Sequence, residues 1–172
     1  DKINFDQADL EIEKVKSAPP SHGRLLELLG FMTSAGAFSI ILQTSFTSAI
    51  AASLIGGIIY FITLWANHSV YIRSTLEALV AFVATVITGL LSLWFDQINI
   101  SMTILASIIV FIPGLSITTA LEEITARNLV SGTAKLFDAL VSLFKQFFGV
   151  VMGLVILPLF VAKHFEFPGV VD

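Results

Sequence analysis

The sequence contains no cysteine, and its three histidines, His22, His68 and His164, lie far apart. Without cysteine the chain can form no disulfide, thiolate nucleophile or cysteine-ligated metal centre. No histidine pair has the spacing of a zinc motif such as H-E-x-x-H. There is also no workable Ser-His-Asp set and no glycine-rich phosphate loop. We therefore predict no metal site, no cofactor and no catalytic residues, and we do not expect an enzyme.

Charged residues are scarce as well. Only 13% of the 172 residues are charged, whereas 56% are hydrophobic, and the mean hydropathy is +0.91. A soluble domain must cover its outside with polar side chains, but a protein surrounded by lipid has no such requirement. The few basic residues are dispersed and the net charge is −4, so we expect no nucleic-acid partner. The composition predicts an integral membrane protein in contact with lipid.

Five apolar segments are close to the roughly 20 residues that a helix needs to cross a bilayer. They cover residues 25–42, 46–66, 74–95, 100–119 and 133–162, with polar separators that include 122–132. Small residues spaced by four, such as Gly149 and Gly153, are typical of closely packed membrane helices. The pattern predicts an all-α, polytopic bundle of about five transmembrane helices at 23–163. It would follow a polar, partly amphipathic segment at 1–22 and precede a short tail at 164–172. Since the chain does not begin with Met, we expect further sequence before Asp1.

The basic residues are found in alternate connections between the apolar segments. By the positive-inside rule, this places the N-terminus in the cytoplasm. We expect a multi-pass protein of the cell inner (plasma) membrane. The residues concerned are Lys14, Lys16, Arg24, Arg73, Arg127 and Lys135.

The fourth apolar segment contains Pro113-Gly114. Proline removes a backbone donor and clashes with the preceding turn, so we expect this helix to be broken there. Unpaired carbonyls at membrane depth must be buried in protein or line a watery cavity, and broken helices form substrate sites in many transporters. A simple packing kink explains the same residues equally well.

Polar residues follow the proline. Ser116, Thr118 and Thr119 could bind a polar solute, and Glu122 and Glu123 could titrate or form a solvated helix end. Charges inside apolar helices are costly and usually functional, and Glu77, Asp138 and Lys145 are the candidates. A local pair with Arg73 is the alternative for Glu77. Snorkelling toward the interface is the alternative for Lys145.

Three stretches of the chain resemble the threonine/serine exporter family. They are Ala106-Ser-Ile-Ile-Val-Phe-Ile-Pro-Gly-Leu-Ser-Ile-Thr-Thr-Ala-Leu-Glu-Glu-Ile, Ser131-Gly-Thr-Ala-Lys-Leu and Phe148-Gly-Val-Val-Met-Gly. The family has an apolar run into Pro-Gly, then a polar and an acidic residue one and two turns later, then a glycine and a basic residue. The matching positions here are Pro113, Gly114, Thr119, Glu123, Gly132 and Lys135. The resemblance covers about residues 10–160 and is closest to the branch in which the exporter is split into two membrane proteins.

The resemblance implies the membrane domain of a secondary exporter. The substrates would be threonine and serine or, in the split branch, succinate, and the partner would be a second set of membrane helices, fused or separate. Many relatives have Asn where this chain has Thr119, and Lys145 matches no family pattern. A homo-oligomer is compatible with the sequence, and a non-transporting scaffold or assembly subunit and a passive channel are the alternatives. We predict a proton-coupled exporter with coupling carboxylates among Glu123, Asp138 and Glu77. The predicted substrate-binding residues are Pro113, Gly114, Ser116, Thr118, Thr119, Lys135 and Lys145.

Overall fold

The computed structural model describes residues 23–66 and 70–161, and every regular element in these ranges is a helix. The prediction of an all-α protein is therefore confirmed. The predicted segments at 1–22 and 164–172 lie outside the described residues. The elements are α2 (Arg24–Ile41), α3 (Phe46–Ala66), α4 (Val70–Ser92), α5 (Ile100–Ser107), the short 3-10 helix η1 (Ile109–Phe111), α6 (Gly114–Thr125) and α7 (Leu129–Val161).

Four of these helices are long and apolar enough to cross a membrane: α2, α3, α4 and α7. A fifth span results if the pair Ile100–Ser107 and Ile109–Thr125, bent by 52°, counts as one. The expected number of about five spans agrees with this count. The 33 residues of α7 extend over about 50 Å at 1.5 Å per residue. Because the hydrocarbon core is only about 30 Å thick, α7 is longer than a single crossing requires.

The connection between α6 and α7 is shorter than the predicted polar separator at 122–132. Instead, α6 continues to Thr125 and α7 begins at Leu129. The backbone N–H groups of Asn128 and Arg127 donate to the carbonyls of Glu123 (2.9 Å) and Ile124 (3.0 Å), and Arg127 has a φ of 65°. This is the Schellman arrangement, which ends a helix abruptly. The prediction of a long separator was wrong because the turn is made by backbone hydrogen bonds that hydropathy does not report.

Helix α2 ends in the same way, where the chain turns into α3. The N–H groups of Gln43 and Thr44 donate to the carbonyls of Ile40 (2.9 Å) and Ser39 (3.3 Å), and Gln43 has a φ of 57°. In both helical hairpins, α2–α3 and α6–α7, a Schellman motif therefore ends the first helix at the turn.

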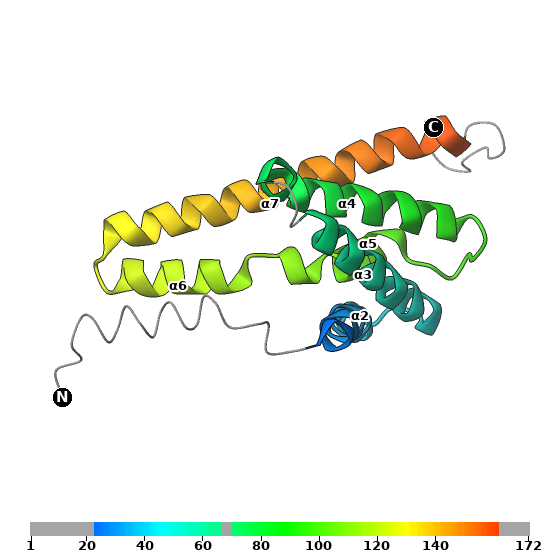
Figure 1. The fold of residues 1–172 in the computed structure, drawn as a ribbon, viewed down its shortest axis with the longest axis horizontal. Coiled ribbons are helices and arrows are strands. Elements are labelled where there is room, and N and C mark those ends of the chain that lie inside the picture. Colours follow the sequence, from blue (N-terminus) through cyan, green and yellow to red (C-terminus); the bar gives the residue numbers. More distant parts are fainter. Residues whose placement is uncertain (1–22, 67–69, 162–172) are drawn as a thin grey trace.

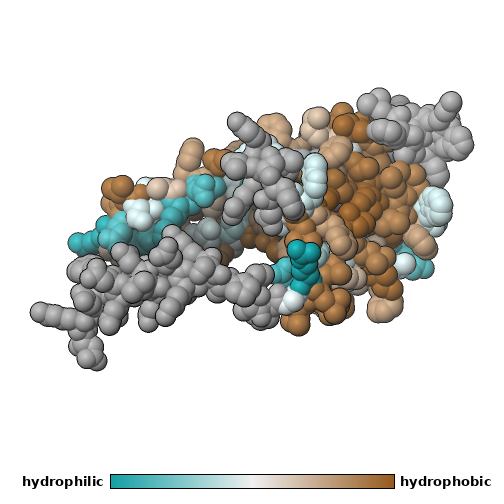
Figure 2. All heavy atoms as spheres, in the orientation of Figure 1, coloured by the Kyte–Doolittle hydropathy of each residue, from teal (hydrophilic) through white to brown (hydrophobic). Residues whose placement is uncertain are grey.

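The helices form a body and a projection (Figure 1). The body contains α2, α3, α4, α5 and the second half of α7, around a core that includes Ile55, Ile59, Val80 and Ile108. The α6–α7 hairpin, meaning α6 and the first half of α7, extends beyond the body, and α6 packs chiefly against α7. Hydrophobic residues cover the body, whereas hydrophilic residues gather over the hairpin (Figure 2).

Glycines set the distance between α7 and α4. A Cβ added at Gly149 would lie 2.2 Å from the carbonyl oxygen of Ala78, and one added at Gly153 would lie 2.6 Å from the Cβ of Thr85. The two glycines thus let the helix backbones approach more closely than any larger residue would allow. The expected close packing at this pair is confirmed.

Candidate functional site

The backbone leaves α-helical geometry between α5 and α6. It turns through η1 after Ser107, and Pro113, with φ −78° and ψ 50°, precedes the first residue of α6. The N–H of Gly114 donates to the carbonyl of Ile112 at 2.7 Å, which closes an inverse γ-turn around the proline. Proline has no N–H and its ring clashes with the carbonyl four residues earlier, which disfavours a regular helix through this point. We call residues 108–113 the break segment.

Phe111 is the residue of the break segment with the most specific contacts. Its carbonyl accepts a 2.8 Å hydrogen bond from Nε2 of Gln146 on α7, and the Gln146 side chain is only 4% exposed. Its ring stands edge-on to that of Phe31 on α2, with 6.3 Å between the ring centroids. Sequence reasoning missed Gln146. An amide in an apolar helix was the available signal, but the sequence does not say which carbonyl it reaches.

The predicted hydroxyl residues follow on α6. Ser116 and Thr118 are exposed, and Thr119 is half-buried. The hydroxyls of Thr118 and Thr119 donate to the carbonyls of Gly114 (2.9 Å) and Leu115 (3.0 Å). Both hydroxyls therefore donate their hydrogen bonds within α6, while the lone pairs of their oxygens remain available to accept one.

An ion pair joins the two helices of the hairpin. Nζ of Lys135 on α7 donates to Oε1 of Glu123 on α6, and the side chains are 47% and 27% exposed. The second carboxylate oxygen of Glu123, Oε2, is buried and makes no hydrogen bond of normal geometry, although the Ser131 hydroxyl is near enough to this carboxylate to stabilise its charge. Gly132 allows this pairing because a Cβ there would lie 2.9 Å from the carbonyl oxygen of Ala120, so α6 and α7 meet at backbone distance.

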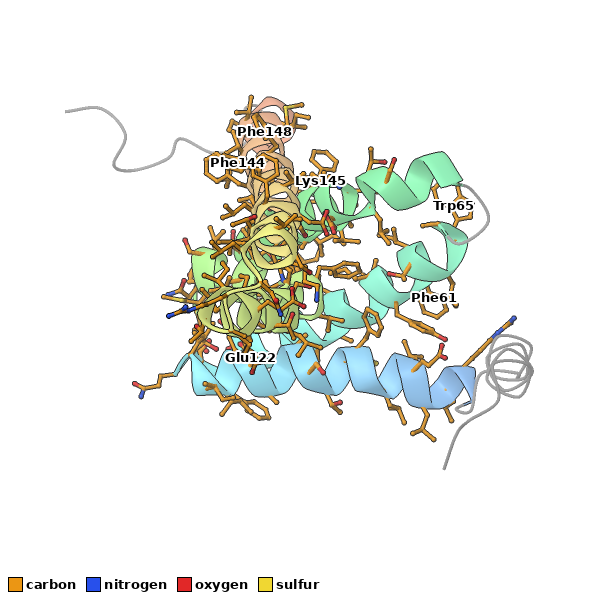
Figure 3. All side chains as sticks on the ribbon, turned by 90° about the vertical axis from the view of Figure 1, so that its left-hand side faces the viewer. Phe61, Trp65, Glu122, Phe144, Lys145 and Phe148 are labelled. Carbon is orange, nitrogen blue, oxygen red and sulfur yellow. The ribbon has the colours of Figure 1, made fainter. Side chains whose placement is uncertain are left out.

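A second ion pair joins α7 to α4, where the hairpin meets the body. Nζ of Lys145 lies 3.5 Å from Oε2 of Glu77, an oxygen that makes no hydrogen bond. Lys145 points from α7 toward α4, whereas Phe144 lies on the other side of α7 (Figure 3). Lys145 therefore has a specific partner. The alternative pairing of Glu77 with Arg73 concerns a side chain outside the described residues.

Residues 1–157 match the family model described as "Putative threonine/serine exporter". The chain belongs to the threonine/serine exporter family. This is a class of membrane transporters and not a class of enzymes, and the apolar helices agree with a multi-pass membrane protein. Neither a curated protein nor a solved structure matches the chain.

The structure of this family member groups the predicted site residues unevenly. Pro113, Gly114, Ser116, Thr118 and Thr119 lie together at the break segment and the start of α6, and the two ion pairs lie along α7. Asp138 is exposed and makes no ion pair or hydrogen bond with another described residue. Asp138 is thus the one predicted coupling carboxylate that the fold leaves outside an ion pair. No group of His, Cys, Asp and Glu in the described ranges could hold a metal.

Three grooves on the described surface are apolar, and none of them is lined by a predicted site residue. One of about 440 Å³ lies between α3, α4 and α7 and is lined by Trp65, Phe82 and Phe148, among others. A second, of about 500 Å³, lies between α2 and α3, and a third, of about 270 Å³, lies along α7. Their linings suit acyl chains or other helices better than a polar metabolite.

Proposed function

We propose that this chain is the membrane domain of a proton-coupled secondary exporter whose substrate is a small hydroxylated amino acid of the threonine and serine type. Membership of the exporter family supports the general class. One observation carries the choice of substrate. The Glu123 carboxylate, one turn beyond Thr119 on α6, pairs with Lys135 through Oε1, while its Oε2 makes no hydrogen bond of normal geometry.

An amino acid zwitterion has the charges that this pair can bind. The ammonium of Lys135 would pair with the substrate carboxylate, and Oε2 of Glu123 would accept from the substrate ammonium. Ser116, Thr119 and Glu123 are spaced by three and four residues, so they lie on one face of α6. Because the Thr119 hydroxyl already donates to a backbone carbonyl, its free lone pair would accept the substrate hydroxyl proton.

A dicarboxylate such as succinate fits less well. It needs two cations close together, but Lys135 and Lys145 lie about 15 Å apart along α7 at 1.5 Å per residue. Each of these lysines is also paired with a glutamate, on α6 and α4 respectively. The arrangement therefore favours a substrate that carries one positive and one negative charge.

Glu123 is the proposed coupling carboxylate. Protonation would remove its charge and release Lys135, so proton binding and substrate binding would compete for one group. Glu77 is the second candidate because it forms the corresponding pair with Lys145. We further propose an inner-membrane location with a cytoplasmic N-terminus, on the charge distribution between the spans. A second membrane subunit or fused helix set would complete the exporter.

Release of labelled threonine, serine and succinate from intact cells tests the proposal. We expect saturable threonine and serine release that stops when the proton gradient is collapsed. Glu123→Gln and Lys135→Met should each reduce it by roughly tenfold or more, because each removes one of the two charges that would bind the zwitterion. Thr119→Val should impair release, whereas Thr125→Val should not, since Thr125 makes the same backbone contact at the far end of α6.

The alternatives predict different results. A scaffold subunit gives no release above cells without the protein, and a passive channel gives release that neither saturates nor depends on the proton gradient. Succinate release without threonine release would overturn the choice of substrate. Unchanged release by both Glu123→Gln and Lys135→Met would overturn the assignment of the site.

A further inference from the structure

The carbonyl of Phe111 is a backbone acceptor that the break segment leaves without its helical partner. In a continuous helix it would accept from the N–H four residues later, on Leu115. Here it accepts from Nε2 of Gln146 at 2.8 Å instead. Gln146 belongs to the buried stripe of α7 that includes Ala139, Ser142 and Gly149. A backbone carbonyl buried against this stripe is costly to leave without a hydrogen bond. The Gln146 amide supplies that bond.

The same residue is also held from the opposite side. The Phe111 ring stands edge-on to Phe31 of α2, and Phe31 contacts the Tyr60 ring of α3 at 5.5 Å between centroids. The Tyr60 hydroxyl in turn donates to the carbonyl of Arg24 at 2.9 Å. The ring contacts therefore tie the break segment to α2 and, through Phe31, to α3. Among residues 23–66 and 70–161, the Gln146 amide is the side chain that ties it to α7 by a hydrogen bond.

Helix α7 holds α6 at both ends. Gln146 contacts Phe111, the last residue of η1 and three residues before the start of α6, and Lys135 pairs with Glu123 near the end of α6. These α7 residues are about 16 Å apart along the axis, which is close to the length of about 18 Å of the 12-residue α6. The neighbouring Lys145 pairs with α4. A slide or rotation of α7 would therefore act on α4 and on both ends of α6.

We propose that Gln146 is a positioning residue for transport, and that its hydrogen bond to Phe111 sets the orientation in which α6 presents Ser116, Thr119 and Glu123. This inference rests on the proposed function. Without the bond, the break segment would take up several arrangements, of which only some align α6 with Lys135. Apparent affinity falls in proportion to the fraction of molecules that are competent to bind.

The transport test compares Gln146→Leu with Ser142→Ala. Ser142 is a buried polar residue one turn earlier on the same stripe, and its loss leaves the Phe111 bond intact. We expect Gln146→Leu to raise the KM for threonine release about tenfold with a maximal rate within about twofold of the native protein. Simple loss of folded protein would lower the maximal rate at an unchanged KM, which contradicts the proposal. Gln146→Met has the same expectation and serves if the leucine variant does not accumulate.

The second test is independent of transport. The native chain has no cysteine, so a single cysteine at Ile112→Cys reports the break segment through its rate of maleimide labelling. We expect Gln146→Leu and Gln146→Met to accelerate labelling several-fold, while Ser142→Ala leaves it unchanged and Thr125→Cys, at the far end of α6, responds less. Unchanged labelling at position 112 overturns the positioning role. If labelling responds but the native protein releases no threonine, the role of Gln146 in the fold stands and the proposed function fails.

Discussion

Gly149 lies where α7 comes closest to α4. An added Cβ would be 2.2 Å from the carbonyl oxygen of Ala78 and 2.9 Å from the Cβ of Ala81. Because optimal contact distances between carbon atoms are about 3.5–4.0 Å, Gly149→Ala must separate the two helices by roughly 1 Å. The nearest obstacle is a backbone oxygen, which cannot rotate away as a side chain would. We therefore expect Gly149→Ala to weaken the packing of α7 against α4.

The magnitude follows from two opposing terms. Overpacking of this kind costs about 1–3 kcal/mol, whereas replacing glycine by alanine inside a helix gains up to about 1 kcal/mol. Gly30→Ala is the matched control because Gly30 lies within α2 and an added Cβ meets nothing within 4 Å. Both variants carry the same propensity gain. The difference between their unfolding free energies therefore isolates the overpacking cost, and Gly149→Ala should be less stable by about 1–3 kcal/mol.

Unfolding of the detergent-solubilised protein can measure this difference. Trp65 lines the groove that also contains Gly149, so tryptophan fluorescence should follow the separation of the two helices. Equal stability of Gly149→Ala and Gly30→Ala would refute the reasoning, because it would mean that α7 does not approach α4 at backbone distance.

Three further predictions concern local features and use the same unfolding measurement. Gly114→Ala should leave stability within about 1 kcal/mol of the native value, since a Cβ there meets nothing within 4 Å; a larger loss would show that α6 begins differently. Arg127→Gly should stabilise the α6–α7 hairpin by about 1 kcal/mol, because a positive φ is unfavourable for a residue with a side chain, and Arg127→Val should destabilise it. Asn99→Ala should cost about 1 kcal/mol because the Asn99 side chain accepts from the N–H of Met102 at the start of α5; an unchanged midpoint would contradict that role.

Hydrophobicity along the chain was sufficient to locate the helices. The predicted span at 46–66 has the same bounds as α3, since polar residues flank a mainly apolar run that contains no charged residue. The small residues of α7 likewise predicted a close contact with another helix, and Gly149 and Gly153 make that contact with α4. These features depend on the size and polarity of each residue, and those properties do not change with the residue's neighbours in the folded chain. Family membership was also accessible, because the motif from Pro113 to Lys135 is contained in the sequence order.

The interaction partners of the polar side chains could not be predicted from the sequence. The sequence showed Arg73 four residues before Glu77, but it did not show that Lys145 of α7 lies beside Glu77 in the folded chain. The separator at 122–132 looked like a loop, although α6 and α7 occupy most of it and a Schellman turn joins them. Nothing in the sequence indicated that the Gln146 amide donates to the Phe111 carbonyl.

The physical reason for this division is the range of the interactions. Transfer of a segment into lipid depends on a sum over its own residues, so about 20 apolar positions in sequence predict a span without further information. A hydrogen bond or ion pair needs two atoms within a few ångströms, and for Gln146 and Lys145 those atoms belong to other helices. The amino-acid sequence alone therefore determined that this protein is a bundle of membrane helices. Only the packing of α7 against α4, η1 and α6 decided which of its polar residues act together.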